Sequence, residues 1–139
     1  MDSCLPSTTL VARRAIGPVR VGDARSRMAS MAGTPTVVAR VVYSYCVAGG
    51  GFVRAVFGER ARSRLVLTTA SVHTAAVERR RSVADLIERA LPVGRGLWRD
   101  GLTVYGVRGK RVSFVAVVDR GLAKSPKRLR RYVVLARKG

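Results

Sequence analysis

Few side chains in this sequence could perform acid-base, nucleophilic or metal chemistry. The single histidine, His73, has no cysteine or second histidine at metal-ligand spacing, whereas zinc takes roughly three or four protein ligands. His73 and Glu78 could be drawn as an acid-base pair, but their five-residue separation places them on different faces of a helix. The two cysteines, Cys4 and Cys46, predict neither a disulfide framework nor a zinc site. We therefore expect a protein that is not an enzyme and needs no metal or cofactor.

Positive charge is the unusual property of this chain. Lys and Arg total 27 against 8 Asp and Glu, which gives a net charge of +19, and all but four of the cations are Arg. The planar guanidinium group of Arg can bind a phosphate through two hydrogen bonds and can stack on a base. Such an excess of like charge repels itself and is relieved by a polyanion. The composition therefore favours a nucleic-acid partner.

Strand-like segments and one helix would position these cations. Enrichment in β-branched and aromatic residues predicts the strands. They are TVVARVVYSYCVA, FVRAVF, LVLTTA, LTVYGV, VSFVAVV and YVVLA. The strong helical pattern spans residues 73–91 before Pro92, and Ser82 with Asp85 resembles a capping box, so this helix either breaks near Arg81 or runs on unbroken. The order β-β-β-α-β-β-β predicts an α+β fold with one main helix and a small antiparallel sheet or partly open barrel of about six strands.

Two regions differ in composition. Residues 1–35 are rich in Arg, Ser, Gly and Pro, and predict a basic, extended N-terminal arm, with a targeting segment as the alternative. Residues 36–139 predict a single α+β RNA-binding domain with basic loops and a C-terminal strand. In this interpretation the run KSPKRLRR at 124–131 is a basic loop held at both ends, because YVVLA after it would pair into the sheet.

The candidate RNA contacts lie mostly in predicted turns and connections, where cations reach a partner without being buried. The predicted contacts are Arg54, Arg60, Arg62, Arg64, Trp98, Arg99, Arg108, Lys110, Arg111, Lys124, Lys127, Arg128, Arg130, Arg131, Arg137 and Lys138. Trp98 is either a core residue or a platform on which bases stack. Tyr43, Tyr45 and Tyr105 are secondary candidates for stacking.

These observations predict a structural RNA-binding protein of a large ribonucleoprotein, in which Arg-rich loops neutralise the phosphates of ribosomal RNA. The expected assembly is a ribosome, mitochondrial or cytoplasmic, so the protein would be intracellular and would contact neighbouring ribosomal proteins. No aromatic RNP signature, KH loop, zinc finger or heptad pattern is present. The first alternative is a viral nucleic-acid-binding or coat protein. The second is a basic accessory subunit of an organellar membrane complex that is not itself inserted, because the longest apolar stretch, residues 112–118, is far shorter than the roughly 20 residues that span a bilayer.

Overall fold

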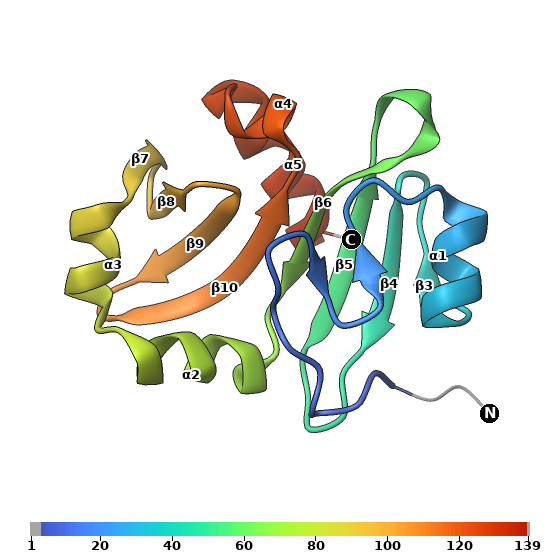
Figure 1. Ribbon diagram of the computed structural model, residues 1–139, viewed down its shortest axis with the longest axis horizontal. Coiled ribbons are helices and arrows are strands. Elements are labelled where there is room, and N and C mark those ends of the chain that lie inside the picture. The colour runs from blue at the N-terminus through green and yellow to red at the C-terminus, as the bar shows by residue number, and fades with distance from the viewer. Residues whose placement is uncertain (1–3, 139) are drawn as a thin grey trace.

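The computed structural model describes residues 4–138, except for the side chain of Glu59, and contains an eight-stranded antiparallel sheet with helices on both faces (Figure 1). The strand order is β3-β4-β5-β6-β10-β9-β8-β7, so β3 and β7 form the two edges. The strands are β3 (Val37–Val38), β4 (Val42–Cys46), β5 (Phe52–Phe57), β6 (Ser63–Thr68), β7 (Leu91–Gly94), β8 (Leu97–Asp100), β9 (Thr103–Arg108) and β10 (Arg111–Val118).

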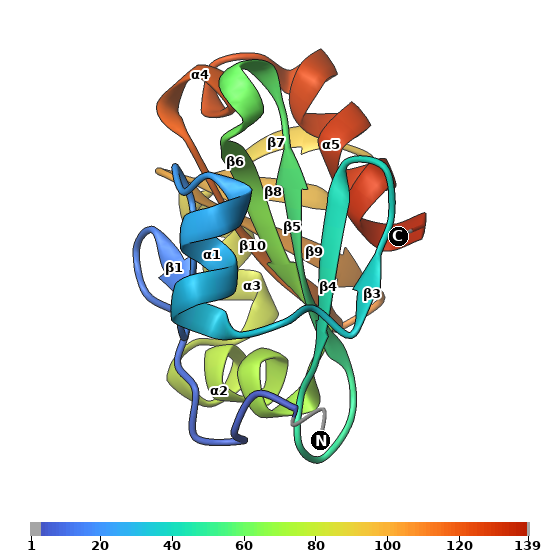
Figure 2. The ribbon, with the colours of Figure 1, turned by 90° about the vertical axis from the view of Figure 1, so that its right-hand side faces the viewer.

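The remaining elements are a separate short hairpin and the helices. They are β1 (Ala15–Ile16), β2 (Val19–Arg20), α1 (Arg25–Ala32), the 3-10 helix η1 (Glu59–Ala61), α2 (Ser71–Arg80), α3 (Val83–Arg89), α4 (Arg120–Ala123) and α5 (Pro126–Lys138). In Figure 2, α5 lies on one side of the strands, and α1 and β1 lie on the other. Within residues 4–138, no helix is both long enough and apolar enough to cross a membrane.

The predicted α+β class is confirmed, but its finer description is wrong in two respects. The sheet is open and has eight strands, so neither a barrel nor a count of about six strands is correct. The described chain also has five α-helices instead of one main helix. The expected helix at 73–91 breaks at Arg81, and the Oγ of Ser82 accepts a hydrogen bond from the Asp85 amide at 3.2 Å to begin α3. Pro92 then lies inside β7, an edge strand, where a missing N–H is tolerated.

The C-terminal strand YVVLA is also wrong, because these residues belong to α5. Leu129, Val133 and Ala136 recur at spacings of four and three, and all three side chains are buried against the sheet. The guanidinium group of Arg54 donates to the backbone oxygens of Ala136 and Arg137 at 2.9 and 3.0 Å, which satisfies carbonyls in the last turn. The run at 124–131 is therefore mainly the start of an amphipathic helix instead of a loop between strands.

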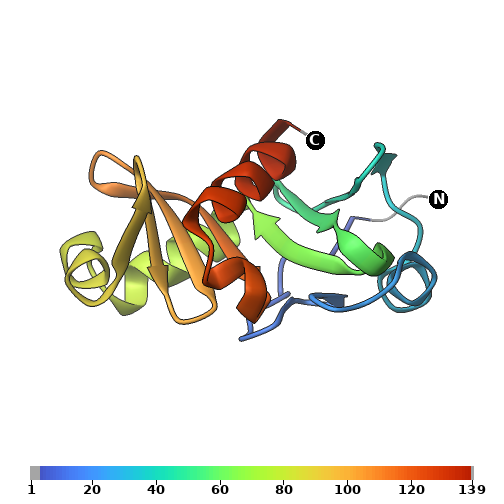
Figure 3. The same cartoon turned by 90° about the horizontal axis from the view of Figure 1, so that it is seen from above.

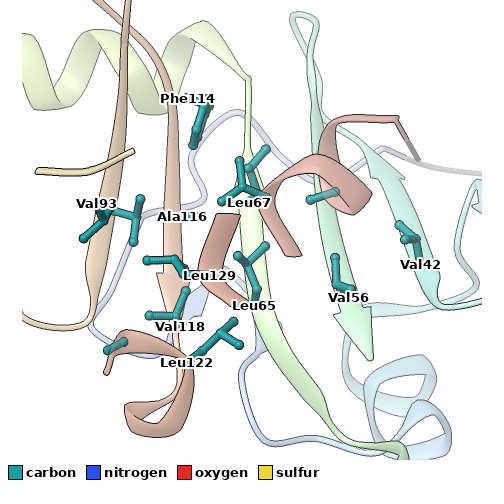
Figure 4. Packing of buried hydrophobic residues seen from close by; sticks show 14 residues of the cluster. Val42, Val56, Leu65, Leu67, Val93, Phe114, Ala116, Val118, Leu122 and Leu129 are labelled. Carbon is teal, nitrogen blue, oxygen red and sulfur yellow. The ribbon is translucent and has the colours of Figure 1, made fainter. Parts of the chain in front are cut away.

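One core cluster lies between the sheet and α5. Leu65 of β6, Phe114 of β10 and Leu129 of α5 are among its almost fully buried members (Figure 4). The ring of Phe114 occupies the space beside Gly106, where an added Cβ would lie 2.0 Å from a ring carbon. Only glycine at position 106 permits this packing.

The N-terminal segment contributes to the core on the other face. Ile16, Val19 and Met28 are fully buried in a second cluster with residues of β4, β5, β6 and β10. Residues 1–35 were predicted as an extended arm, but their described part, 4–35, includes β1, β2 and α1. The backbone that carries the arginines of this segment is therefore packed against the sheet through its apolar residues.

The two cysteines, from which no disulfide framework was predicted, form a disulfide bond. Their sulfur atoms are 2.05 Å apart and their Cα atoms 4.6 Å apart. Residue 4 reaches β4 because the Leu5 amide donates to the Cys46 carbonyl at 2.8 Å and Leu5 forms a parallel bridge with Val47. The bond therefore fastens the start of the described chain to the sheet.

His73 joins the N-terminal segment to α2. Its Nδ1 lies 2.7 Å from the Oγ1 of Thr68, and its Nε2 lies 3.0 Å from the Oγ1 and 3.1 Å from the backbone oxygen of Thr9. Burial lowers the pKa of His73 below its ordinary value of 6.5, and the hydrogen bond with the Thr9 backbone opposes this effect. The folded state therefore favours neutral imidazole.

We expect the free energy of unfolding to decrease as the pH falls below about 6.5, because the unfolded chain binds a proton at His73 before the folded chain does. The contribution of neutral His73 to the free energy of unfolding is complete above the pKa of His73 in the unfolded chain. It is lost as the pH falls towards the lower pKa of His73 in the folded chain. Thermal melts of the wild type and of His73→Gln over this range measure the effect. The variant should lack this part of the pH dependence, and an identical decrease of Tm in both proteins would contradict the prediction.

Candidate nucleic-acid interface

A pocket of about 520 Å³ lies where the β8–β9 turn meets α4 and the N-terminal segment. Four cations line it, Arg13, Arg99, Arg120 and Lys124, together with one acid, Asp100. We call it the cationic pocket. Within residues 4–138, the side chains of Arg13, Arg120 and Lys124 make no hydrogen bond or ion pair. These three charges are therefore available to an anionic ligand.

Asp119 fixes the short helix α4, which carries Arg120 and is followed directly by Lys124. Its Oδ1 accepts a hydrogen bond from the Leu122 amide at 2.7 Å and so caps the N-terminus of α4. The guanidinium group of Arg64 donates to both carboxylate oxygens at 2.7 and 3.2 Å. Burial would raise the pKa of Asp119, but the hydrogen bonds from Arg64 and Leu122 and the charges of Arg64 and Arg128 outweigh burial and lower it. Asp119 is therefore ionised at neutral pH and holds Arg120 at the pocket.

Arg99 differs from these three cations because part of its guanidinium group already makes a hydrogen bond within the chain. One of its terminal nitrogens donates to the Gly101 carbonyl at 2.8 Å and so fastens the β8–β9 turn, where Gly101 has a φ of 63°. Its Nε is buried and has no hydrogen-bond partner in the described part of the chain. A buried donor without an acceptor costs roughly 1–3 kcal/mol. Arg99 therefore carries an unsatisfied buried donor beside the cationic pocket.

Two further pockets adjoin the cationic pocket. One, of about 480 Å³, is lined by Arg13 as well, and by Arg14, Arg20 and Arg27 with Asp23. The other, of about 280 Å³, is lined by Arg60, Arg62 and Arg64 with Asp119, the residue before Arg120. We call the cations of the three pockets the basic band. Figure 3 shows the N-terminal hairpin (blue), η1 (green) and α4 (orange-red) along one side of the sheet.

Several of the predicted contact residues lie in the basic band. The members of the basic band that were predicted as RNA contacts are Arg60, Arg62, Arg64, Arg99 and Lys124. Of these, Arg64 is committed to Asp119, and Arg62 donates to the Gly22 carbonyl at 2.9 Å.

Other predicted contacts are engaged elsewhere in the chain. Arg54 holds the end of α5 and lies 3.6 Å from the centre of the Phe52 ring, and burial lowers its pKa. Arg111 pairs with Glu78 at 3.1 Å, and Arg130 donates to the Val93 carbonyl at 2.8 Å. These three residues stabilise the fold, whether or not they also contact a ligand.

The remaining predicted cations form two other groups. Arg108 and Lys110 are exposed at the β9–β10 turn, at the opposite end of β9 from the cationic pocket. The second group lies on α5. It comprises Lys127, Arg128, Arg131, Arg137 and Lys138, and it lies beside Arg130, which donates to Val93. Its outer face is therefore a second basic surface, on the opposite side of the sheet from β1 and α1 (Figure 2).

The aromatic residues predicted to stack on bases differ in their exposure. Tyr45 is buried, donates to the Gly33 carbonyl at 3.2 Å, and has a pKa raised to about 12 by burial and by Tyr43. It is therefore a core residue. Trp98 and Tyr105 are half-buried and pair directly across β8 and β9, on the same face of the sheet.

The sequence interpretation missed part of the basic band. Arg13, Arg14, Arg20 and Arg27 were assigned to an arm, and Arg120 was not singled out. The alternation of apolar residues with Arg around Gly17 and Pro18 could have indicated a hairpin. No known protein family, curated protein or solved structure matches this chain. Function is therefore inferred from these residues alone.

Proposed function

We propose that this protein is a structural RNA-binding protein of a large ribonucleoprotein, and we favour a ribosome as that assembly. The observation that carries this proposal is the cationic pocket, because Arg13, Arg120 and Lys124 come from distant parts of the sequence and converge without partners in the described chain. Like charges brought together in this way repel one another until an anion neutralises them. RNA phosphates supply such charge at regular spacing along a chain.

Binding would depend mainly on the RNA backbone. The basic band and the outer face of α5 lie on different sides of the molecule, so two RNA segments, or two parts of one folded RNA, could contact it (Figure 2). A protein with cations on two sides can hold RNA elements together within an assembly. Val37 and Val38 of the edge strand β3 are 52% and 64% exposed, and they offer a place for a neighbouring protein.

The disulfide bond favours a second candidate function. Disulfides persist in oxidising environments, including virion surfaces, and are rare in the cytosol. The Cys4–Cys46 bond therefore supports the alternative of a viral nucleic-acid-binding or coat protein. Sedimentation distinguishes the two. Co-sedimentation with ribosomal subunits that RNase abolishes supports the first, whereas regular RNase-resistant particles support the second.

Removal of three partner-free cations from the cationic pocket tests the proposed function. The variant carries Arg13→Gln, Arg120→Gln and Lys124→Gln, and its affinity for a single-stranded RNA is measured over a range of salt concentrations. We expect the slope of log affinity against log salt to decrease in magnitude by about 2, because each lost phosphate contact contributes about 0.7.

A matched variant controls for net charge. Arg40→Gln, Arg79→Gln and Arg89→Gln also remove three charges, at exposed positions that do not line the cationic pocket. This control should keep most of the wild-type slope. A wild-type affinity that does not change with salt would refute phosphate neutralisation, and an equal loss of slope in both variants would refute the assignment to this pocket.

A further inference from the structure

A smaller pocket of different character adjoins the cationic pocket. It has a volume of about 260 Å³ and lies between the end of α2, the start of α3 and strands β8 and β9. Its lining residues are Val77, Arg80, Arg81, Leu86, Asp100 and Tyr105. Asp100 lines the cationic pocket as well, so the two pockets are neighbours. A ligand of modest size could occupy both.

The wall of the smaller pocket is apolar and aromatic. Leu86 is 4% exposed and belongs to a core cluster against which Val77 and Tyr105 pack. Trp98 lies directly across the β8–β9 ladder from Tyr105, which places the two Cβ atoms roughly 5 Å apart. Phosphate alone needs no such wall, whereas the flat face of a base stacks on aromatic and apolar side chains.

Three charged groups surround this wall. Arg80 and Arg81 lie at the C-terminal end of α2, where the helix dipole favours cations. Burial and the charge of Asp100 raise the pKa of Tyr105, and the charges of Arg81 and Arg80 oppose this, so all three groups act on its hydroxyl. The Asp100 carboxylate can accept hydrogen bonds from the amino and N–H groups on a base edge, and the two arginines can bind phosphate.

We propose that the smaller pocket, which we call the base pocket, binds one unpaired base of a single-stranded RNA while the cationic pocket binds the adjacent backbone phosphates. This inference rests on the proposed function and assigns the RNA strand its place on the protein. The volume is slightly below the roughly 300–1,000 Å³ typical of small-molecule sites, which suits a single base better than stacked base pairs. The partner is therefore an unpaired segment of RNA instead of a regular duplex.

Comparison of two oligomers tests this proposal on the full-length protein. One is a short single-stranded RNA, and the other is an oligomer of equal length with the same backbone and no bases. The protein has one tryptophan, Trp98, so its fluorescence reports on the region beside Tyr105. We expect the RNA to bind more tightly than the abasic oligomer and to quench Trp98 emission, whereas the abasic oligomer should bind without this quenching.

Two substitutions of Tyr105 separate stacking from packing. Tyr105→Leu keeps an apolar side chain but removes the ring, and should weaken RNA binding by about 5- to 150-fold while leaving the abasic affinity unchanged. Tyr105→Phe keeps the ring and should retain most of the RNA affinity. Thermal melts establish that each variant is folded. If Tyr105→Leu does not fold, the comparison of the two oligomers on the wild type still tests whether a base contributes to binding.

The outcomes separate this inference from the proposed function. Equal affinity of the wild type for RNA and the abasic oligomer would overturn the base pocket but leave backbone binding in place. An equal decrease in both affinities for folded Tyr105→Leu would also overturn it, because Tyr105 would then act only through packing. Failure to bind either oligomer would refute the proposed function itself.

Discussion

Replacement of both cysteines, by Cys4→Ser with Cys46→Ser, is expected to lower the free energy of unfolding by about 4 kcal/mol. The two residues are 42 positions apart in the sequence, and a cross-link that closes a loop of this length restricts the unfolded chain by about that amount. Urea unfolding followed by Trp98 fluorescence and circular dichroism measures the change. The midpoint should shift to lower urea concentration.

Reduction of the wild type provides a control for this prediction. A thiol reductant should lower the stability of the wild type towards that of the double variant and should leave the double variant unchanged. Equal stability of the oxidised and reduced wild type would contradict the prediction. The bond anchors the segment that carries Arg13 of the cationic pocket, so reduction should also weaken RNA binding. The decrease should be partial, because the buried apolar residues of the same segment also hold it to the sheet.

Local sequence patterns were sufficient to predict the central strands. Three short segments rich in apolar residues lie in the middle of the sheet as β5, β6 and β10, namely FVRAVF, LVLTTA and VSFVAVV. The same criterion was wrong for YVVLA, where two adjacent valines suggested a strand. There, helical spacing of Leu129, Val133 and Ala136, together with the capping contact from Arg54, outweighs β-propensity. The information that decides α5 therefore comes partly from β5, far away in the sequence.

The sequence indicated that the candidate site is cationic, but it did not indicate which cations lie together in the structure. Charge counts predicted a polyanion partner, and Arg99 and Lys124, both predicted as RNA contacts, line the cationic pocket. Their partners Arg13 and Arg120 could not be recognised, because the cluster forms only when the N-terminal segment packs across the sheet and Asp119 caps α4. The disulfide was missed for the same reason, since the proximity of residues 4 and 46 is a property of the tertiary structure.

Asp119→Ala is expected to lower the free energy of unfolding by about 2–4 kcal/mol. The substitution removes the α4 cap and leaves the Arg64 guanidinium group, whose side chain is 13% exposed, without its carboxylate. Loss of one partner of a fully buried ion pair costs about 3–5 kcal/mol, and the 25% exposure of the Asp119 side chain reduces that cost. Chemical unfolding measures the change. A decrease below about 1 kcal/mol would contradict the role given to this pair.

Two further measurements separate the cap from the charge. Asp119→Asn can still accept the Leu122 amide hydrogen bond, so it should destabilise the protein less than Asp119→Ala. Because the pKa of Asp119 is lowered in the folded state, its stabilising contribution is complete above the ordinary value of 3.8 and is lost as the pH falls through the folded pKa. The stability difference between wild type and Asp119→Asn should therefore shrink in acid.

RNA binding by Asp119→Ala tests whether RNA affinity depends on the total positive charge of the protein or on the positions of the cations in the cationic pocket. The substitution raises the net positive charge of the protein by one unit, so a surface that acted only through total charge would bind RNA more tightly. In the structure, however, Asp119 holds the first turn of α4 and with it Arg120 and Lys124 at the cationic pocket. We expect weaker RNA binding under conditions where the variant is folded. Tighter binding would show that the placement of these cations does not matter.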